Sequence, residues 1–152
     1  MKQTVKDVGF EIASDVSVDG DNFSKKVIAN PGDVLTLRLK YKNIGHPFQK
    51  QIVCRDRLPK GIEYIEGTTT FRASYRDNVD GPLRDNLFAI SGMNMGDFKL
   101  NEWMIITYKT KVADDTDAFK DCSTTVHNDA SVATANGTGY VKVEIVVNRQ
   151  EI

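Results

Sequence analysis

The sequence predicts an all-β fold, a sandwich of two antiparallel sheets, on three observations. Apolar and polar residues alternate with a period of two in several segments. Turn-forming residues separate those segments, and no window carries an apolar stripe with the period of a helix. At 152 residues, the chain is long enough to bury one substantial core but short for two. We therefore expect a single domain over residues 1–152.

The expected strands follow the alternation. The clearest is Val34–Asn43, whose apolar side consists of Leu35, Leu37, Leu39 and Tyr41. Residues 10–18, 104–112 and 141–147 show the same pattern, with mostly polar side chains at the intervening positions. Successive side chains of a strand point to opposite faces, so each segment is expected to have one buried and one solvated face.

Turn signals lie between these segments: Asp19-Gly20, Asn30-Pro31-Gly32-Asp33, Leu58-Pro59-Lys60-Gly61, Asp80-Gly81-Pro82 and Asn136-Gly137. Glycine supplies positive φ angles at such positions, and proline supplies a fixed φ. Short strands with turns at this spacing are typical of an immunoglobulin-like β-sandwich of Greek-key type. Asn136-Gly137-Thr138 also matches a glycosylation acceptor, but we interpret Asn136-Gly137 as a hairpin turn.

Composition and charge exclude several classes of function. The 20 basic and 21 acidic residues give a net charge of -1, which leaves no excess charge for binding nucleic acid or an anionic membrane. No uncharged segment is long enough for direct insertion into a membrane. The sequence carries no nucleophile elbow, phosphate-binding glycine loop or zinc-binding histidine pair. We therefore expect no enzyme activity and no cofactor.

Candidate metal ligands are few. The acidic stretches 15–21 and 114–121 lack the ligand spacing of a calcium loop, so we interpret them as solvated turns and expect no metal. Cys54 and Cys122 are too few for a metal cluster or a disulfide framework. One disulfide and two buried thiols both remain open.

Two polar residues are predicted to point into the core. Asp56 shares the parity of Ile52, Cys54 and Leu58, and Asn128 shares the parity of Val126, Ala130 and Val132. Burial of either side chain costs free energy unless the side chain finds a partner. The pair is therefore the strongest candidate for a site within the sandwich.

Four motifs in order resemble a known bacterial repeat. They are Asn30-Pro31-Gly32-Asp33, Tyr41-Lys42-Asn43-Ile44-Gly45, the segment 56–64 with Leu58-Pro59-Lys60-Gly61, and His127-Asn128-Asp129-Ala130-Ser131-Val132. Their order is similar to that of the conserved surface repeat known as domain of unknown function eleven. Ile44 and the insertion His46-Pro47-Phe48 depart from its pattern. The resemblance implies a sandwich domain strung in arrays on bacterial surfaces, without catalytic turnover.

Similar Gram-positive surface domains form an intramolecular isopeptide bond, which suggests a role for the buried pair. Asp56 would be the proton-shuttling acid, Asn128 the electrophile and Lys26 the nucleophile. Lys25 and Lys6 are alternatives to Lys26, because the alternation in residues 24–28 does not decide which face each lysine takes. The other interpretation is that Asp56 and Asn128 are simply hydrogen-bonded and the lysines are solvated.

The function implied is a non-enzymatic structural or adhesive module, a stalk or spacer unit of a bacterial cell-surface protein. The chain would be an excised piece of an extracellular, cell-surface or cell-wall attached protein, with its export signal and anchor outside the fragment. Its partners would be neighbouring domains of the same chain, and a host or cell-wall protein or glycan. The alternative is a carbohydrate- or protein-binding module, which an exposed row of aromatic rings would support. The candidate rings are Tyr64, Phe71, Tyr75 and Trp103, although we favour core packing for most of them.

Overall fold

A computed structural model describes residues 3–5, 9–75, 81–82, 87–114 and 119–149, and these residues form strands and loops. The strands are β1 (Gln3–Val5), β2 (Phe10–Ser17), β3 (Lys26–Ala29), β4 (Val34–Asn43), β5 (Phe48–Gln49), β6 (Val53–Arg57), β7 (Ile62–Tyr64), β8 (Thr70–Ala73), β9 (Gly81–Pro82), β10 (Met93–Asn94), β11 (Phe98–Lys99), β12 (Trp103–Val112), β13 (Ser123–Thr134) and β14 (Gly137–Asn148). The described residues contain no helix, so the all-β prediction is confirmed.

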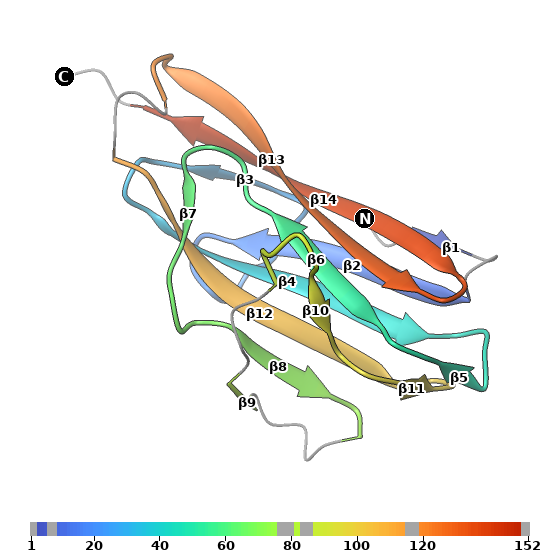
Figure 1. Cartoon of the computed structure of the whole chain (residues 1–152). Coiled ribbons are helices and arrows are strands. Elements are labelled where there is room, and N and C mark those ends of the chain that lie inside the picture. The colour runs from blue at the N-terminus through green and yellow to red at the C-terminus, as the bar shows by residue number, and fades with distance from the viewer. Residues whose placement is uncertain (1–2, 6–8, 76–80, 83–86, 115–118, 150–152) are drawn as a thin grey trace.

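Two sheets face each other as the layers of a sandwich (Figure 1). The larger sheet has the order β1-β2-β4-β12-β8-β9, with β7 also paired to β12, and the smaller sheet has the order β10-β6-β13-β14-β3. A short β5-β11 ribbon accompanies them. Within the described ranges, strand pairs are antiparallel except β3 with β14, which is parallel.

The strands lie close to where alternation placed them. Val34–Asn43 is β4, and its inward side chains are buried at every second position. The last hairpin differs slightly from the prediction, because Ala135 and Asn136 form the turn and Thr134 pairs with Gly137. The turn is therefore one residue earlier than the Asn136-Gly137 pair.

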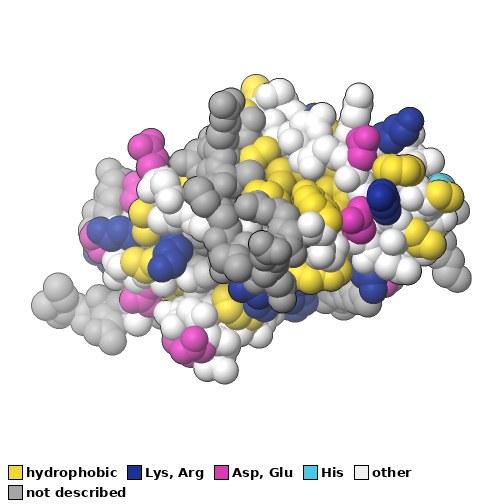
Figure 2. Space-filling model, turned by 90° about the horizontal axis from the view of Figure 1, so that it is seen from below, with side chains coloured by type: hydrophobic (Ala, Val, Ile, Leu, Met, Phe, Trp, Pro, Cys, Tyr) yellow, Lys and Arg dark blue, Asp and Glu magenta, His cyan; other side chains and the backbone are white. Residues whose placement is uncertain are grey.

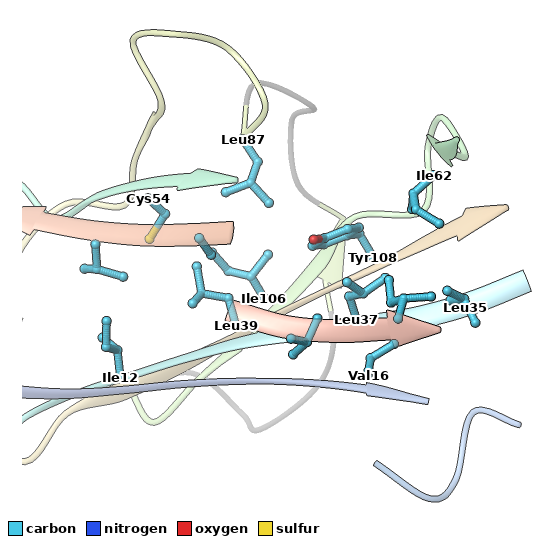
Figure 3. Close-up of a cluster of buried hydrophobic side chains, with 14 of the residues drawn as sticks. Ile12, Val16, Leu35, Leu37, Leu39, Cys54, Ile62, Leu87, Ile106 and Tyr108 are labelled. Atoms are coloured by element: carbon cyan, nitrogen blue, oxygen red, sulfur yellow. The ribbon is translucent and has the colours of Figure 1, made fainter. Parts of the chain in front are cut away.

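The core lies between the two sheets and draws side chains from both. Figure 3 shows Ile12 of β2, Leu39 of β4 and Ile106 of β12 on one side, and Cys54 of β6 on the other. All four are at most 1% exposed. Burial of apolar side chains from both layers is the main term that holds such a sandwich together.

A buried asparagine closes the loop after β4. The Nδ2 group of Asn43 donates to the carbonyl oxygens of His46 at 2.9 Å and Phe98 at 3.0 Å, and its Oδ1 accepts the backbone N–H of His46 at 3.2 Å. This residue belongs to the Tyr41-Lys42-Asn43-Ile44-Gly45 motif, so the motif has a structural explanation in loop closure.

The surface carries charges of both signs. On the face seen in Figure 2, hydrophobic side chains gather near the middle, while basic and acidic side chains are scattered around them. The described residues include no helix with the length and hydropathy needed to cross a membrane.

Candidate functional site

Asp56 and Asn128 meet in the core, as their parity predicted. Asp56 lies on β6 and Asn128 on the adjacent strand β13, and the two residues are 6% and 2% exposed. From the opposite sheet, β12 brings the fully buried Tyr108 to the same point. We call these three residues the core polar cluster.

Hydrogen bonds join the three side chains. The Tyr108 hydroxyl donates to Oδ2 of Asp56. Nδ2 of Asn128 donates to the Tyr108 hydroxyl oxygen at 2.9 Å and lies 3.3 Å from Oδ2 of Asp56. No described residue bonds to Oδ1 of Asp56 or to Oδ1 of Asn128. Since buried polar atoms without partners cost free energy, the core polar cluster is a costly arrangement for the fold.

The Asp56 carboxyl group holds its proton to unusually high pH. Burial raises its pKa from the ordinary 3.8 to about 7, the hydrogen bonds from Tyr108 and Asn128 oppose that rise, and the charge of Asp129 adds to it. Burial, and then the Asp56 carboxylate, raise the pKa of Tyr108 well above 10. None of the hydrogen bonds to Asp56 among the described side chains comes from a cation. The cluster can therefore store a proton near neutral pH.

The structure does not bring Lys26 to this cluster. Parallel pairing of β3 with β14 places Lys26 opposite Glu144. The Lys26 ammonium lies 3.2 Å from Oε2 of Glu144, and its side chain is 61% exposed. The hydrogen bond from Lys26 is the main cause that lowers the pKa of Glu144. Lys26 is therefore engaged on the outer face of the smaller sheet, away from the core.

The other two lysines considered have different positions. The Nζ group of Lys25 donates to the backbone carbonyl of Ser14 on β2, at 2.5 Å. Burial lowers the pKa of Lys25, and the charges of Lys40 and Arg38 lower it further. A lowered pKa leaves more of an amine unprotonated and able to attack, but the Lys25 side chain is bound to the larger sheet. Lys6 lies outside the described residues.

The candidate aromatic residues do not form one row. Tyr64 and Phe71 lie opposite Thr110 and Ile106 of β12, both of which are buried. Trp103, also on β12, has the opposite parity and lines the outer face. Tyr75 is 50% exposed and packs edge-on against Phe98 at 5.5 Å between ring centroids. A shared sugar-stacking platform is therefore wrong for these four rings.

The first acidic stretch and the cysteines have structural explanations. Both oxygens of Asp15 bind Arg38 at 2.8 Å, and Oδ1 of Asp19 accepts the backbone N–H groups of Asp21 and Asn22 at 2.8 Å each.

Cys54 is buried in the core and Cys122 is exposed, and no disulfide links them. The expectation of two buried thiols therefore holds for Cys54 alone.

A second candidate site is a groove of about 1340 Å³ over the outer face of the smaller sheet. The strand register sets two rows of its lining residues side by side: Arg55, Ser131 and Tyr140, and then Arg57, Asp129 and Lys142. The loop residues Phe88, Ala89 and Ile90 form one wall, and Lys25 also lines the groove. We call this feature the outer groove.

The wall of the outer groove is tied to β6. Nε of Arg55 donates to the carbonyl oxygen of Ile90 at 2.9 Å, and Nη2 donates to that of Ser91 at 3.3 Å. The backbone N–H of Asp56 donates to the carbonyl of Leu87 at 3.0 Å. These bonds hold the loop beside the sheet, so the groove has an anchored wall.

Sequence reasoning missed Tyr108 as a member of the core polar cluster and missed the outer groove. The parity of Tyr108 predicted its burial, and a buried tyrosine hydroxyl needs a hydrogen-bond partner. That requirement is a usable signal, but it does not name the partner. The outer groove had no signal along the chain, because its residues come from three strands and a loop.

Comparison with solved structures identifies similar folds. The major pilin subunit BcpA of Bacillus cereus aligns with a TM-score of 0.61 at 13% identity, over 93% of this chain and 40% of that chain. The N-terminal domain of the Streptococcus gordonii adhesin Sgo0707 aligns with a TM-score of 0.57 at 14% identity, over 90% and 32%. The C-terminal domain of the Streptococcus agalactiae AgI/II polypeptide BspA aligns with a TM-score of 0.55 at 14% identity, over 90% and 49%.

No family model matches this chain, and no curated protein matches it. The resemblance to the surface repeat of unknown function therefore has no support from a family model. The chain spans about a third to a half of the length of the three structures. At these identities the likeness concerns the fold, and it confirms the immunoglobulin-like β-sandwich, which this chain shares with domains of bacterial adhesins and pilins.

Proposed function

We propose that the chain is a non-enzymatic structural module of a bacterial cell-surface protein, a stalk or spacer unit that contributes to adhesion. Residues 1–152 would be one module of a longer extracellular chain, attached to the cell surface or cell wall, with neighbouring domains as its first partners. The path of the chain through the sandwich is the observation that carries this proposal. The shared fold with adhesin and pilin domains supports it.

The two described ends of the chain lie far apart along the strands. β1 pairs with the start of β2, with Gln3 opposite Ile12, and Gly139 near the start of β14 lies against Ile12. From Gly137, β14 continues for 12 residues to Asn148, a length of about 36 Å. Figure 1 shows β1 in the right half of the sandwich and the end of β14 at the left. Tension between neighbouring modules would therefore act along the strands.

Strand pairing is suited to resist such tension. β14 has 12 paired positions with β13 and 4 with β3, and a pull along β14 loads these positions together in shear. β1 has only 3 paired positions with β2, so it should detach first. The load would then pass to β2, which has 8 paired positions with β4.

Single-molecule pulling tests this proposal. With the chain held at its two ends, we expect β1 to detach and the sandwich then to unfold in one cooperative step. That step should lengthen the molecule by roughly 450 Å. Each residue from β2 to β14 contributes up to about 3.6 Å when extended, and the folded sandwich already spans about 36 Å of this length. As a control, the same protein held at residues 123 and 148, which are paired neighbours, should yield at clearly lower force because its bonds then break one at a time. Equal forces in the two geometries would contradict a tension-bearing role.

An isopeptide crosslink is the finer hypothesis for this module, with Lys26, Asp56 and Asn128 as its residues. In that reaction the lysine amine attacks Cγ of Asn128, ammonia leaves, and Asp56 carries the proton between them. The described contacts favour the uncrosslinked form. Lys26 is bound to Glu144, and the Tyr108 hydroxyl takes the position beside the Asn128 amide.

The intact mass of the reduced protein checks this point. We expect the full mass calculated from the sequence, with no loss of ammonia. A deficit of one ammonia molecule that disappears in Asp56→Ala would contradict that expectation and establish the crosslink. Pulling offers an independent check, because a bond between residues 26 and 128 would shorten the unfolding step to roughly 100 Å.

A further inference from the structure

We propose that the outer groove is a docking site for an extended, acidic segment of a partner protein. This inference extends the proposed surface role by naming a class of partner. The volume of the outer groove, its exposed apolar side chains and its charge each favour such a segment.

The size of the outer groove exceeds that of a typical small-molecule site. Its volume is about 1340 Å³, whereas pockets for small ligands are about 300–1,000 Å³. It lies across three neighbouring strands, β6, β13 and β14, and two inter-strand spacings place β6 about 10 Å from β14. An extended peptide spans that distance with about three residues.

Two apolar side chains are exposed at this site. Ile90 on the wall is 98% exposed, and Tyr140 on the floor is 68% exposed. Arg55 connects them, because it binds the carbonyl of Ile90 and shares a register row with Ser131 and Tyr140. Exposed apolar groups beside a concave surface are typical of a protein-binding site.

The charge of the outer groove differs from that of the whole chain. Three basic side chains line it, Arg55, Arg57 and Lys142, against the exposed Asp129, whereas the chain has a net charge of -1. Lys25 also lines the groove, but its ammonium is bound to the carbonyl of Ser14 on the larger sheet. Arg57 and Lys142 flank Asp129 in the strand register. Among the described ion pairs, none involves Arg57 or Lys142. The two cations are therefore placed to meet carboxylates of a partner.

The basic side chains and the exposed apolar side chains of the outer groove together favour a peptide over an acidic glycan. Side chains alternate along an extended peptide, so carboxylates can reach Arg57 and Lys142 while apolar side chains lie against Ile90 and Tyr140. A glycan with carboxylate groups would satisfy the cations but would leave the apolar wall formed by Phe88, Ala89 and Ile90 without a matching partner.

Binding of a defined probe tests the proposal. We expect a fluorescein-labelled random copolymer of glutamate and tyrosine to bind the intact chain at low ionic strength and to shift the amide NMR signals of β6, β13 and β14. The variant Arg57→Glu/Lys142→Glu should weaken binding by about tenfold or more, because it reverses both unpaired charges. Ile90→Ser should weaken it by about threefold without changing the melting temperature, since the side chain is exposed.

A matched variant on the other sheet separates site binding from general charge attraction. Lys42 and Lys109 are exposed on the outer face of the larger sheet, so Lys42→Glu/Lys109→Glu makes the same change in net charge elsewhere. It should alter binding by less than about twofold. Equal losses in the two double variants would overturn the proposal, as would NMR shifts outside the groove or tighter binding of polygalacturonate than of the copolymer. None of these results would bear on the pulling experiment.

Discussion

Asp56→Asn is expected to stabilise the protein above pH 7 and to remove much of its pH dependence between pH 4 and 7. The folded state holds the Asp56 proton up to a pKa of about 7, compared with the ordinary 3.8. Between those values the folded protein binds more protons than the unfolded chain, so its free energy of unfolding falls as pH rises. The loss is complete above pH 7 and amounts to roughly 4 kcal/mol. An asparagine keeps the shape and one acceptor oxygen for Tyr108 and Asn128, without a charge to bury.

Urea unfolding of the wild type and the variant at pH 4.5, 6 and 8 measures this effect. The free energy of unfolding of the variant should rise relative to that of the wild type as pH increases through this range, and the variant should be the more stable protein at pH 8. Asp129→Asn is the matched control, because Asp129 is exposed on β13 and only adds to the pKa shift of Asp56. If Asp56→Asn destabilised the protein equally at all three pH values, the Asp56 carboxylate would have a favourable partner in the folded protein. That result would contradict the inference that folded Asp56 keeps its proton up to about pH 7.

Gly61→Ala should destabilise the fold by about 3 kcal/mol, through two separate causes. Gly61 has a φ of +91°, and a Cβ atom there would lie 2.4 Å from Cζ of the buried Phe119 ring. The left-handed backbone costs an alanine about 1–2 kcal/mol, and forcing an extra carbon into a filled core costs about 1–3 kcal/mol. In a domain of this size the melting temperature should fall by roughly 6–12 °C.

Gly67→Ala separates the two causes. Gly67 has a similar φ of +79°, but a Cβ atom there would meet nothing within 4 Å. This variant should therefore lose only the backbone part, about 1–2 kcal/mol. Thermal unfolding of both variants measures the difference between them. Equal losses would mean that the Phe119 ring moves aside without cost and that the contact with Gly61 does not hold the loop in place.

Local pattern predicts the faces of the strands well. Alternation placed Asp56 and Asn128 in the core, and both are buried. The turn at Leu58-Pro59-Lys60-Gly61 was visible for the same reason, because the positive φ of Gly61 is a property of a few consecutive residues. Such features depend on the period of the backbone and on the conformations that each residue allows.

Contacts between strands were outside the reach of local pattern. In the segment 24–28 both lysines fit the alternation equally well, and only the parallel pairing of β3 with β14 sets Lys26 opposite Glu144. Likewise, burial of Tyr108 was predictable, but its meeting with Asp56 requires two sheets to pack at a particular offset. Register and sheet packing are set by interactions between residues distant in the chain, which a single segment does not encode.

The sequence by itself therefore determined the all-β class, the main strands and the burial of the Asp56–Asn128 pair, since each follows from side-chain periodicity along one strand. The tertiary structure alone decided that the third member of the core polar cluster is a tyrosine and that Lys26 lies outside. It also assembled the outer groove from β6, β13, β14 and the loop that Arg55 holds. The physical reason is that a site made of several strands depends on register, and register is a property of the packed sandwich.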